Sequence, residues 1–151
     1  MKSLKLIALL ITVVTLFSCG ASGAKEFNDK LVKIQLSLMD EVNAMKTDTL
    51  DALTKLTKVK NSAKAKITEF KAVSGPKDGE NFRQAMIDDF DGIISSYDVL
   101  IKMVYAQDNE SELAKLQDEF GEWQKKLEVL DEKVLSEQKK FVARYNIRLE
   151  K

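Results

Sequence analysis

Residues 80–106, with the sequence ENFRQAMIDDFDGIISSYDVLIKMVYA, decide the fold class of this chain. Their large apolar residues recur in steps of three and four, the spacing that places side chains on one face of an α-helix. The residues of this stripe are Phe82, Met86, Phe90, Ile93, Ile94, Tyr97, Leu100, Ile101 and Val104. The opposite side is expected to be a solvated acidic face, made of Asp88, Asp89, Asp91 and Asp98. The pattern predicts one long amphipathic helix.

The segment before this helix contains the clearest turn signal in the chain. Residues 74–79 read Ser-Gly-Pro-Lys-Asp-Gly and hold the only proline and two of the six glycines, so a loop is predicted here. Upstream, residues 49–73 repeat the apolar spacing and carry a basic face of Lys55, Lys58, Lys60, Lys64, Lys66 and Lys71. Because a short loop joins helices of opposite charge, they are predicted to pack as an antiparallel pair.

A further helix is predicted before this pair. Residues 25–46 carry a single apolar stripe, formed by Phe27, Leu31, Ile34, Leu38, Val42 and Met45. The polar residues that follow interrupt the stripe, and Asp48 is expected to cap the next helix, which is expected to begin at Thr49.

The last predicted helix follows residue 106. Asn109 and Glu112 have the spacing of a capping box, in which the asparagine side chain accepts from the backbone and the glutamate reaches back. The apolar stripe then continues to Leu149. At 1.5 Å per residue this helix would be about 58 Å long. It is therefore expected to overhang the others or to bend, with Gly121 as the expected position of the bend.

Four amphipathic helices with short connections predict an all-α fold, an antiparallel up-down-up-down four-helix bundle over residues 25–151. No alternating apolar run bounded by turn residues predicts a strand. Helices of this length also fit a three-helix arrangement or a swapped dimer, and the monomeric four-helix bundle is preferred.

The amino-acid composition argues against several classes of function. The 151 residues include 24 basic and 24 acidic side chains, no histidine and a single cysteine. A balanced charge argues against a nucleic-acid partner, which requires a strongly basic face. Because histidine is the commonest general base and the commonest metal ligand, and no catalytic spacing of other residues is recognisable, no enzyme activity, cofactor or metal site is expected.

The N-terminus predicts export and lipidation. Lys2 and Lys5 precede an apolar run of signal-peptide length, too short to cross a bilayer as a helix. Residues 16–19, Leu-Phe-Ser-Cys, resemble a bacterial lipobox, in which a peptidase cuts before a lipid-modified cysteine. The prediction is a signal peptide at residues 1–18, a lipid on Cys19 and a flexible tether over residues 19–24. The alternative is an ordinary secretory signal with an incidental cysteine.

The start of the mature chain resembles a family. Residues 26–32, Glu-Phe-Asn-Asp-Lys-Leu-Val, followed by Gln35, resemble the N-terminal segment of small helical bacterial lipoproteins of spirochaetes and Bacteroidota, often described as surface proteins of unknown function. Phe82, Gln138 and Phe141 are similar to later positions of that family. The resemblance implies an all-helical fold and brings no mechanism.

One candidate site follows from the predicted topology. The start of the first helix should lie beside the end of the last, and Asn28, Gln35 and Gln138 flank the apolar stripes of these two helices. A polar contact is therefore predicted between them near the membrane. It either fixes the register of the helices or forms a small polar ligand site.

Two further side-chain groups have alternative interpretations. The basic residues near the C-terminus either contact anionic lipid or suit a helix C-terminus; they are Lys139, Lys140, Arg144, Arg148 and Lys151. Three aromatic residues either line a pocket between helices or belong to the core; they are Trp123, Tyr97 and Tyr105. The core is the preferred interpretation.

The sequence therefore predicts a lipid-anchored protein of the bacterial envelope. The second residue of the mature chain is Gly20 and not aspartate, so the protein is expected at the outer membrane. It is expected to be a non-catalytic binding or interaction module, bound to the membrane through Cys19 and possessing a protein partner. The alternative is a carrier with a small-ligand site between helices, and an enzyme is the third choice.

Overall fold

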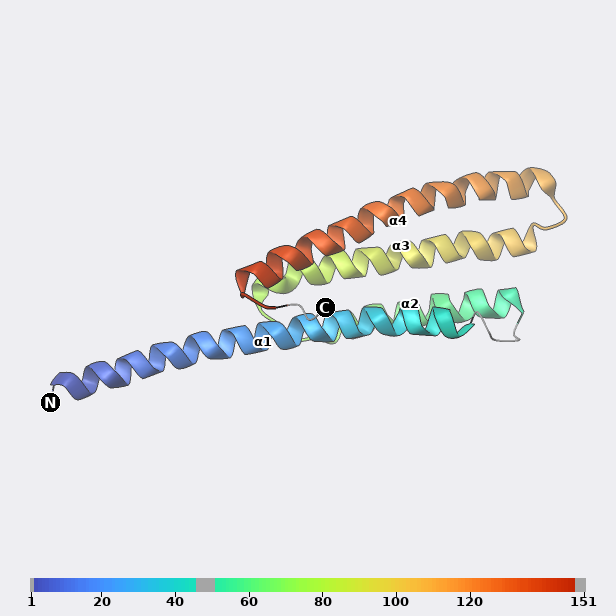
Figure 1. Cartoon of the computed structure of the whole chain (residues 1–151). Helices are drawn as coiled ribbons and strands as arrows, with labels where there is room; N and C mark the ends of the chain where they lie inside the picture. The colour runs from blue at the N-terminus through green and yellow to red at the C-terminus, as the bar shows by residue number, and fades with distance from the viewer. Residues whose placement is uncertain (1, 46–50, 149–151) are drawn as a thin grey trace.

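The computed structural model describes residues 2–45 and 51–148, with the side chains of residues 22–44 and 51–148. Over these residues the chain is all-helical, as predicted. The elements in order are α1 (Lys2–Met45), α2 (Ala52–Ala72), the short 3-10 helix η1 (Lys77–Gly79), α3 (Glu80–Tyr105) and α4 (Glu110–Arg144). Figure 1 shows the second half of α1 beside α2, α3 and α4, while its first half extends alone beyond the bundle. No helix formed by the described residues combines the length and apolar composition that a bilayer crossing requires.

The central helices begin and end close to the predicted positions. Helix α3 spans the predicted segment, and η1 lies inside the predicted loop. Helix α2 begins later than predicted, because Asp51 is its N-cap: Thr54 donates its backbone N–H to Asp51 Oδ1 at 2.9 Å and its hydroxyl to Oδ2 at 2.7 Å. The expected cap, Asp48, lies outside the described residues.

The N-terminus of α4 has half of the predicted capping box. The Asn109 side chain accepts from the backbone N–H of Glu112 at 3.2 Å. The Glu112 carboxylate accepts from the Asn109 side-chain amide at 3.3 Å, because the backbone N–H of Asn109 already donates to the Ala106 carbonyl at 2.9 Å.

Helix α4 ends before the predicted Leu149. Asn146 has a φ of 52°, the left-handed conformation that asparagine tolerates better than most residues. The backbone N–H of Ile147 then donates to the Val142 carbonyl at 2.9 Å, and that of Asn146 donates to the Ala143 carbonyl at 3.3 Å. These two bonds form a Schellman motif, which satisfies the last carbonyls and turns the chain away.

The core has two parts. The larger part draws buried residues from all four α-helices, including Phe27 and Leu31 of α1, Phe70 of α2, Phe90 of α3 and the C-terminal half of α4. The smaller part, here called the far core, is formed by α3, its C-cap residue and α4; its residues are Val99, Ala106 and Leu116, with Met103, Phe120 and Trp123 packed against them.

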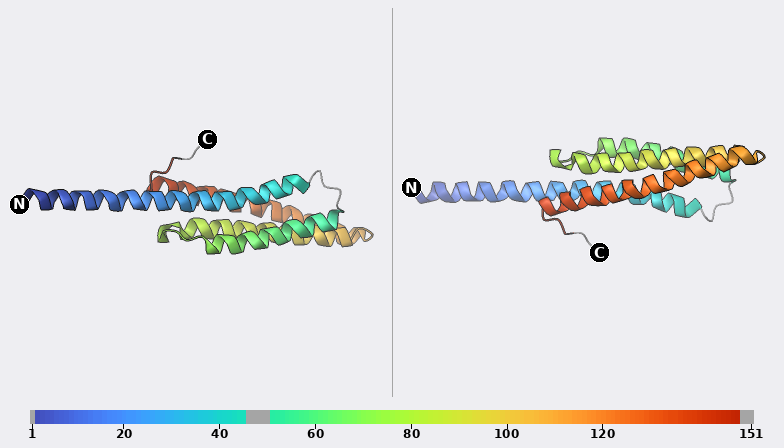
Figure 2. Two further views of the ribbon diagram at one scale, coloured as in Figure 1. Left: turned by 90° about the horizontal axis from the view of Figure 1, so that it is seen from below. Right: turned by 90° about the horizontal axis from the view of Figure 1, so that it is seen from above.

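Helices α3 and α4 extend past the end of α1. Figures 1 and 2 show their connecting turn at the tip of the molecule, beyond the last turn of α1 in every view. Helix α4 is a single helix of 35 residues, so it overhangs α1 without a break at Gly121. A Cβ at Gly121 would meet no atom within 4 Å, so this glycine is not required by packing.

Candidate functional site

The end of the bundle nearest the N-terminal extension is filled by aromatic rings; it is called the closed end. The ring of Phe27 lies 5.4 Å from that of Phe141 and 6.5 Å from that of Phe82, edge to face with the latter. A Cβ built on Gly75 would overlap the Phe27 ring, and one on Gly79 would lie 2.5 Å from Phe27 Cε1. The loop glycines are therefore needed for close approach, because neither has a positive φ.

A polar contact joins α1 and α4 at the closed end. Gln138 donates its side-chain amide to Asn28 Oδ1 at 3.1 Å, and Asn28 donates to Asp29 Oδ1 at 3.1 Å. Asn28 is only 3% exposed. Of the three residues predicted here, the structure brings Asn28 and Gln138 together. Gln35 lies two turns farther along α1, half-buried, with no side-chain hydrogen bond to either.

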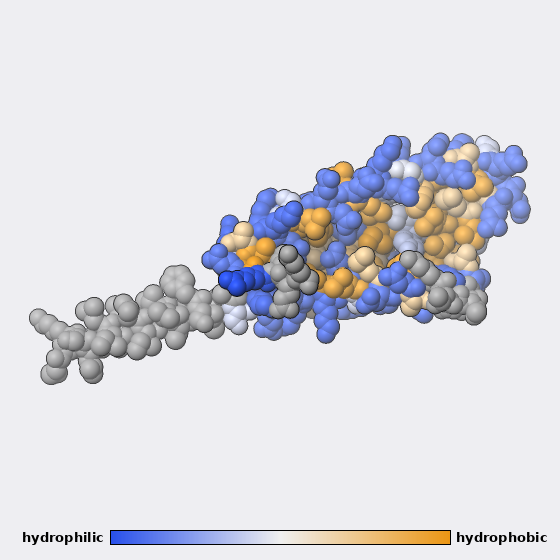
Figure 3. Space-filling model, in the orientation of Figure 1, coloured by the Kyte–Doolittle hydropathy of each residue, from blue (hydrophilic) through white to orange (hydrophobic). Residues whose placement is uncertain are grey.

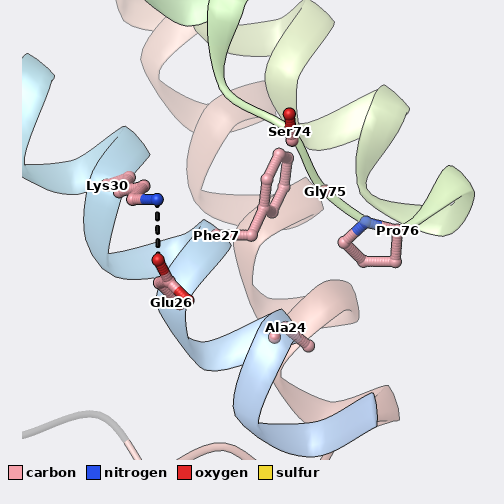
Figure 4. A pocket seen from close by; sticks show the side chains of 8 residues that line it. Ala24, Glu26, Phe27, Lys30, Ser74, Gly75 and Pro76 are labelled. Carbon is pink, nitrogen blue, oxygen red and sulfur yellow. Dashed lines mark ion pairs between the residues drawn. The ribbon is translucent and has the colours of Figure 1, made fainter. Parts of the chain in front are cut away.

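The surface of the closed end carries a hollow of about 430 Å³ between α1 and the loop before α3. Figure 4 shows Phe27 pointing at residues 74–76, with Glu26 and Lys30 on the near side of α1. These two charged side chains pair with each other at 2.7 Å, and the ammonium of Lys30 lowers the pKa of the Glu26 carboxyl. The predicted lipobox, residues 16–19, lies just upstream, where side chains are outside the described residues.

The basic residues near the end of α4 have acidic neighbours. Arg144 pairs with Asp78 at 2.7 Å, and Lys140 pairs with Glu137 at 2.6 Å. Lys139 and Arg148 are exposed, and Lys151 lies outside the described residues. At least two of the five cations are therefore engaged within the protein, which reduces the charge left for a lipid surface.

Beyond the closed end, α4 diverges from α1 (Figures 1 and 2). In this part of the bundle lies a concave surface, here called the open groove. It has a volume of about 230 Å³, and its lining comes from three helices: Leu38, Met39, Val42 and Asn43 of α1, Val59 of α2, and Ile93 and Tyr97 of α3. Figure 3 shows apolar side chains gathered along the middle of this face of the molecule.

The groove lies along a flank of α1 that α4 covers only at the closed end. Met39 lies 11 residues after Asn28, so it points only about 20° away from the direction of Asn28 around α1. Asn28 faces α4 at the closed end. Met39, on the same flank, is 56% exposed, and Leu36 is 51% exposed. The flank of α1 that α4 covers at the closed end is therefore uncovered farther along.

Tyr97 is the main polar group of the open groove. Its side chain is half-buried, and burial raises the pKa of its phenol. Its hydroxyl makes no hydrogen bond to any described residue. The other two aromatic residues considered above lie elsewhere: Trp123 is half-buried in the far core, with the Lys126 ammonium 4.2 Å from its ring centroid. Tyr105 is 73% exposed, so its assignment to the core was wrong.

The acidic side of α3 differs from the prediction at one residue. Asp89 is 4% exposed and is not part of a solvated face. Burial, and secondarily the negative charge of Asp131 on α4, raise the pKa of Asp89 to about 7. Two other residues of the predicted acidic face are ion-paired: Asp88 accepts from Lys133 of α4 at 2.7 Å, and Asp98 pairs with Lys60 of α2.

Two searches bear on other kinds of site. Among the described residues, no three or more His, Cys, Asp or Glu side chains are grouped so that they could hold a metal ion. Comparisons of the chain with protein-family models, with curated proteins and with solved structures find no match. The candidate sites therefore rest on the geometry of this chain alone. Among them, the open groove combines a mostly apolar lining with contributions from three helices.

Proposed function

We propose that this chain is a lipid-anchored protein of the bacterial envelope that acts as a non-catalytic binding module. In this proposal residues 1–18 are removed as a signal peptide and Cys19 carries the lipid. Residues 19–24 connect the lipid to a monomeric up-down-up-down bundle. The basic n-region, the short apolar run and the lipobox-like residues 16–19 support the anchoring half.

The open groove is the observation that carries the binding half of the proposal. Three helices present apolar side chains to a concavity of about 230 Å³, and the adjoining flank of α1 exposes more than half of Met39. Ligand sites are typically concave and mostly apolar, with a few polar groups that orient the ligand. Tyr97 and Asn43 supply such groups here.

A second candidate function is a carrier for a small molecule, which the same groove favours over a flat docking face. The closed end favours it less, since its aromatic rings and loop glycines are packed against each other. A protein partner would instead use the exposed apolar residues on this flank of α1, which are Met39 of the groove lining and Leu36 beside it.

The anchoring half is tested by Cys19→Ala in cells fed a radiolabelled fatty acid. The expected result is loss of the label, accumulation of the uncleaved chain and loss of the processed form from the membrane fraction. Ser18→Ala, which keeps a small residue before the cleavage site, is the matched control and should still be labelled. Normal cleavage and release of the Cys19→Ala protein would instead support the ordinary secretory signal.

The face of the membrane is tested by adding protease to intact cells and following this protein beside a periplasmic control. Cleavage while the control survives would assign the bundle to the cell surface. Protection that ends only when the outer membrane is opened would assign it to the periplasm.

A further inference from the structure

We infer that the open groove binds an uncharged small molecule, with an apolar body of about ten heavy atoms and one oxygen that hydrogen-bonds to the Tyr97 hydroxyl. The inference rests on the binding function proposed above and names the class of ligand. Aliphatic or aromatic alcohols, phenols and esters have this chemistry.

The size follows from the volume of the groove. A closed apolar cavity of about 150 Å³ is filled by benzene, which has six heavy atoms. The open groove measures about 230 Å³, one and a half times as much, so it accepts a body of about nine or ten heavy atoms. A dissociation constant of roughly 0.1 mM is expected for a ligand of this size.

The absence of charge follows from the lining. Five of the lining side chains are aliphatic or thioether, and the two polar ones, Asn43 and Tyr97, are neutral. Five charged residues adjoin the lining in sequence, but none of them lines the groove itself; they are Asp40, Glu41, Lys58, Lys60 and Asp98. Lys60 pairs with Asp98, and Glu41 pairs with Lys66 at 3.8 Å. A charged ligand would therefore lose hydration in the groove without gaining a counter-ion, which is unfavourable.

The orientation follows from Tyr97. Its ring forms part of the wall, and its hydroxyl, which has no hydrogen-bond partner among the described residues, is left to donate to whatever fills the groove. The Asn43 amide, at the exposed rim, offers a second donor or acceptor. An apolar wall with a polar group at one side favours a ligand with one oxygen at one end.

The test uses the full lipidated chain in phospholipid nanodiscs and a photoreactive alcohol of ten heavy atoms, ethanol that carries a butynyl-substituted diazirine at its second carbon. After irradiation, mass spectrometry maps the label. The expected result is saturable labelling of peptides that contain Met39 or Tyr97. The corresponding carboxylic acid, charged at neutral pH, should require at least tenfold more probe for the same labelling.

Matched tyrosine variants distinguish binding in the groove from non-specific labelling of the protein surface. Tyr97→Phe removes one hydroxyl and keeps the ring, so half-saturation should move to about five- to tenfold higher probe concentration. Tyr105→Phe makes the same change at a tyrosine of α3 that is 73% exposed, and it should leave labelling unchanged. Equal labelling of both variants and of the original chain would overturn the role of Tyr97.

Other outcomes would overturn the proposal that the groove binds a neutral small molecule. Labelling that does not saturate, that spreads over the helices or that is equally strong with the acid contradicts a neutral ligand in the groove. Labelling that falls as the protein concentration rises would show that a second copy covers the groove instead. The same samples report anchoring through the mass of the lipidated N-terminal peptide, so failure of the ligand and failure of the anchor are seen separately.

Discussion

The closed end and the open groove are formed by neighbouring turns of the same helices, yet the interior of one is packed with aromatic rings while the other is a concavity among three helices. At the closed end, Phe27 packs against two other phenylalanine rings, and glycines let the loop lie directly on it. At the groove, residues on the same flank of α1 lose the cover of α4 and Met39 is more than half exposed. The difference lies in where α4 lies relative to α1, since both regions have apolar residues at helical spacing.

The comparison shows that apolar periodicity predicts which face of a helix avoids water. It does not predict whether another helix, a loop or a ligand covers that face. At the closed end the stripe of α1 packs against side chains of α3 and α4 and against the loop before α3. In the groove the neighbour of α1 is solvent or a ligand. Mutations that act through packing should therefore be costly at the closed end and mild farther along the bundle.

The largest expected effect is that of Phe27→Ala. Removing a fully buried phenylalanine should lower the free energy of unfolding by about 3–5 kcal/mol, because it leaves a cavity among the other rings. Phe120→Ala, the same change at a half-buried site of the far core, should cost about 1–2 kcal/mol. Urea unfolding followed by far-UV circular dichroism measures both. Equal losses would contradict the contrast between the two regions.

Glycine variants sharpen the contrast. A methyl group at Gly75 would overlap the Phe27 ring, so Gly75→Ala should cost about 1–3 kcal/mol through forced movement of the loop. Gly121→Ala adds a methyl group where no atom lies within 4 Å and should instead stabilise α4 by up to about 1 kcal/mol. Thermal unfolding of the two variants should show shifts of opposite sign. A neutral Gly75→Ala would show that the loop is not closely held.

Asp89, on α3 between the two regions, should make stability depend on pH. The folded pKa of about 7 lies above the usual 3.8 of an aspartate. The folded state therefore binds the proton more tightly, and the stability from this group is complete below about pH 4 and is lost as pH rises to 7.

Asp89→Asn should remove this loss. One pKa unit corresponds to about 1.4 kcal/mol, which sets an upper limit near 4 kcal/mol, and contact with water should reduce the gain at pH 8 to about 1–3 kcal/mol. At pH 4 the variant and the original chain should be nearly equal. Denaturation at both pH values gives the result. Asp91→Asn, at an exposed site on the same helix, is the matched control and should show no such dependence.

The smallest expected effect is the coupling between Asn28 and Gln138. Replacing both with leucine, singly and together, should give a coupling energy of about 0.5–1.5 kcal/mol, because one hydrogen bond joins them. A double variant that is more stable and behaves normally in the cell would mean that the contact only fixes the register of α1 against α4. Loss of a cellular phenotype with intact stability would favour a ligand site.

Much of the fold could be read from the sequence because it depends on local spacing. The stripe from Phe82 onward, the proline and glycines before it, and Asn109 three residues before Glu112 each act through neighbouring residues. The closeness of Asn28 and Gln138 follows from their positions beside two stripes that a bundle brings together. The early end of α4 was missed, although Asn146 followed by apolar Ile147 is a signal for a left-handed helix end.

The rest depends on contacts between helices. Asp89 lies seven residues after Phe82, so helical spacing already places it on the apolar side of α3, and the prediction overlooked this signal. That Asp131 of α4 lies close enough to raise the pKa of Asp89 depends on the position of α4. The open groove needs knowledge of how far α4 diverges from α1. A signal was present in Leu36 and Met39, which widen the apolar side of α1 beyond the stripe that was recognised. That signal alone does not distinguish a groove from a helix contact.

The overhang of α3 and α4 has a practical consequence. Helix α4 is 35 residues long, about 50 Å, and it ends beside the N-terminal side of the bundle (Figure 1). In a molecule held by Cys19, the C-terminal end of α4 would be on the side of the bundle that faces the bilayer. An epitope inserted at Gln107 and Asp108, in the turn at the tip, would stand farthest from it. An antibody reporter of membrane sidedness therefore belongs in that turn.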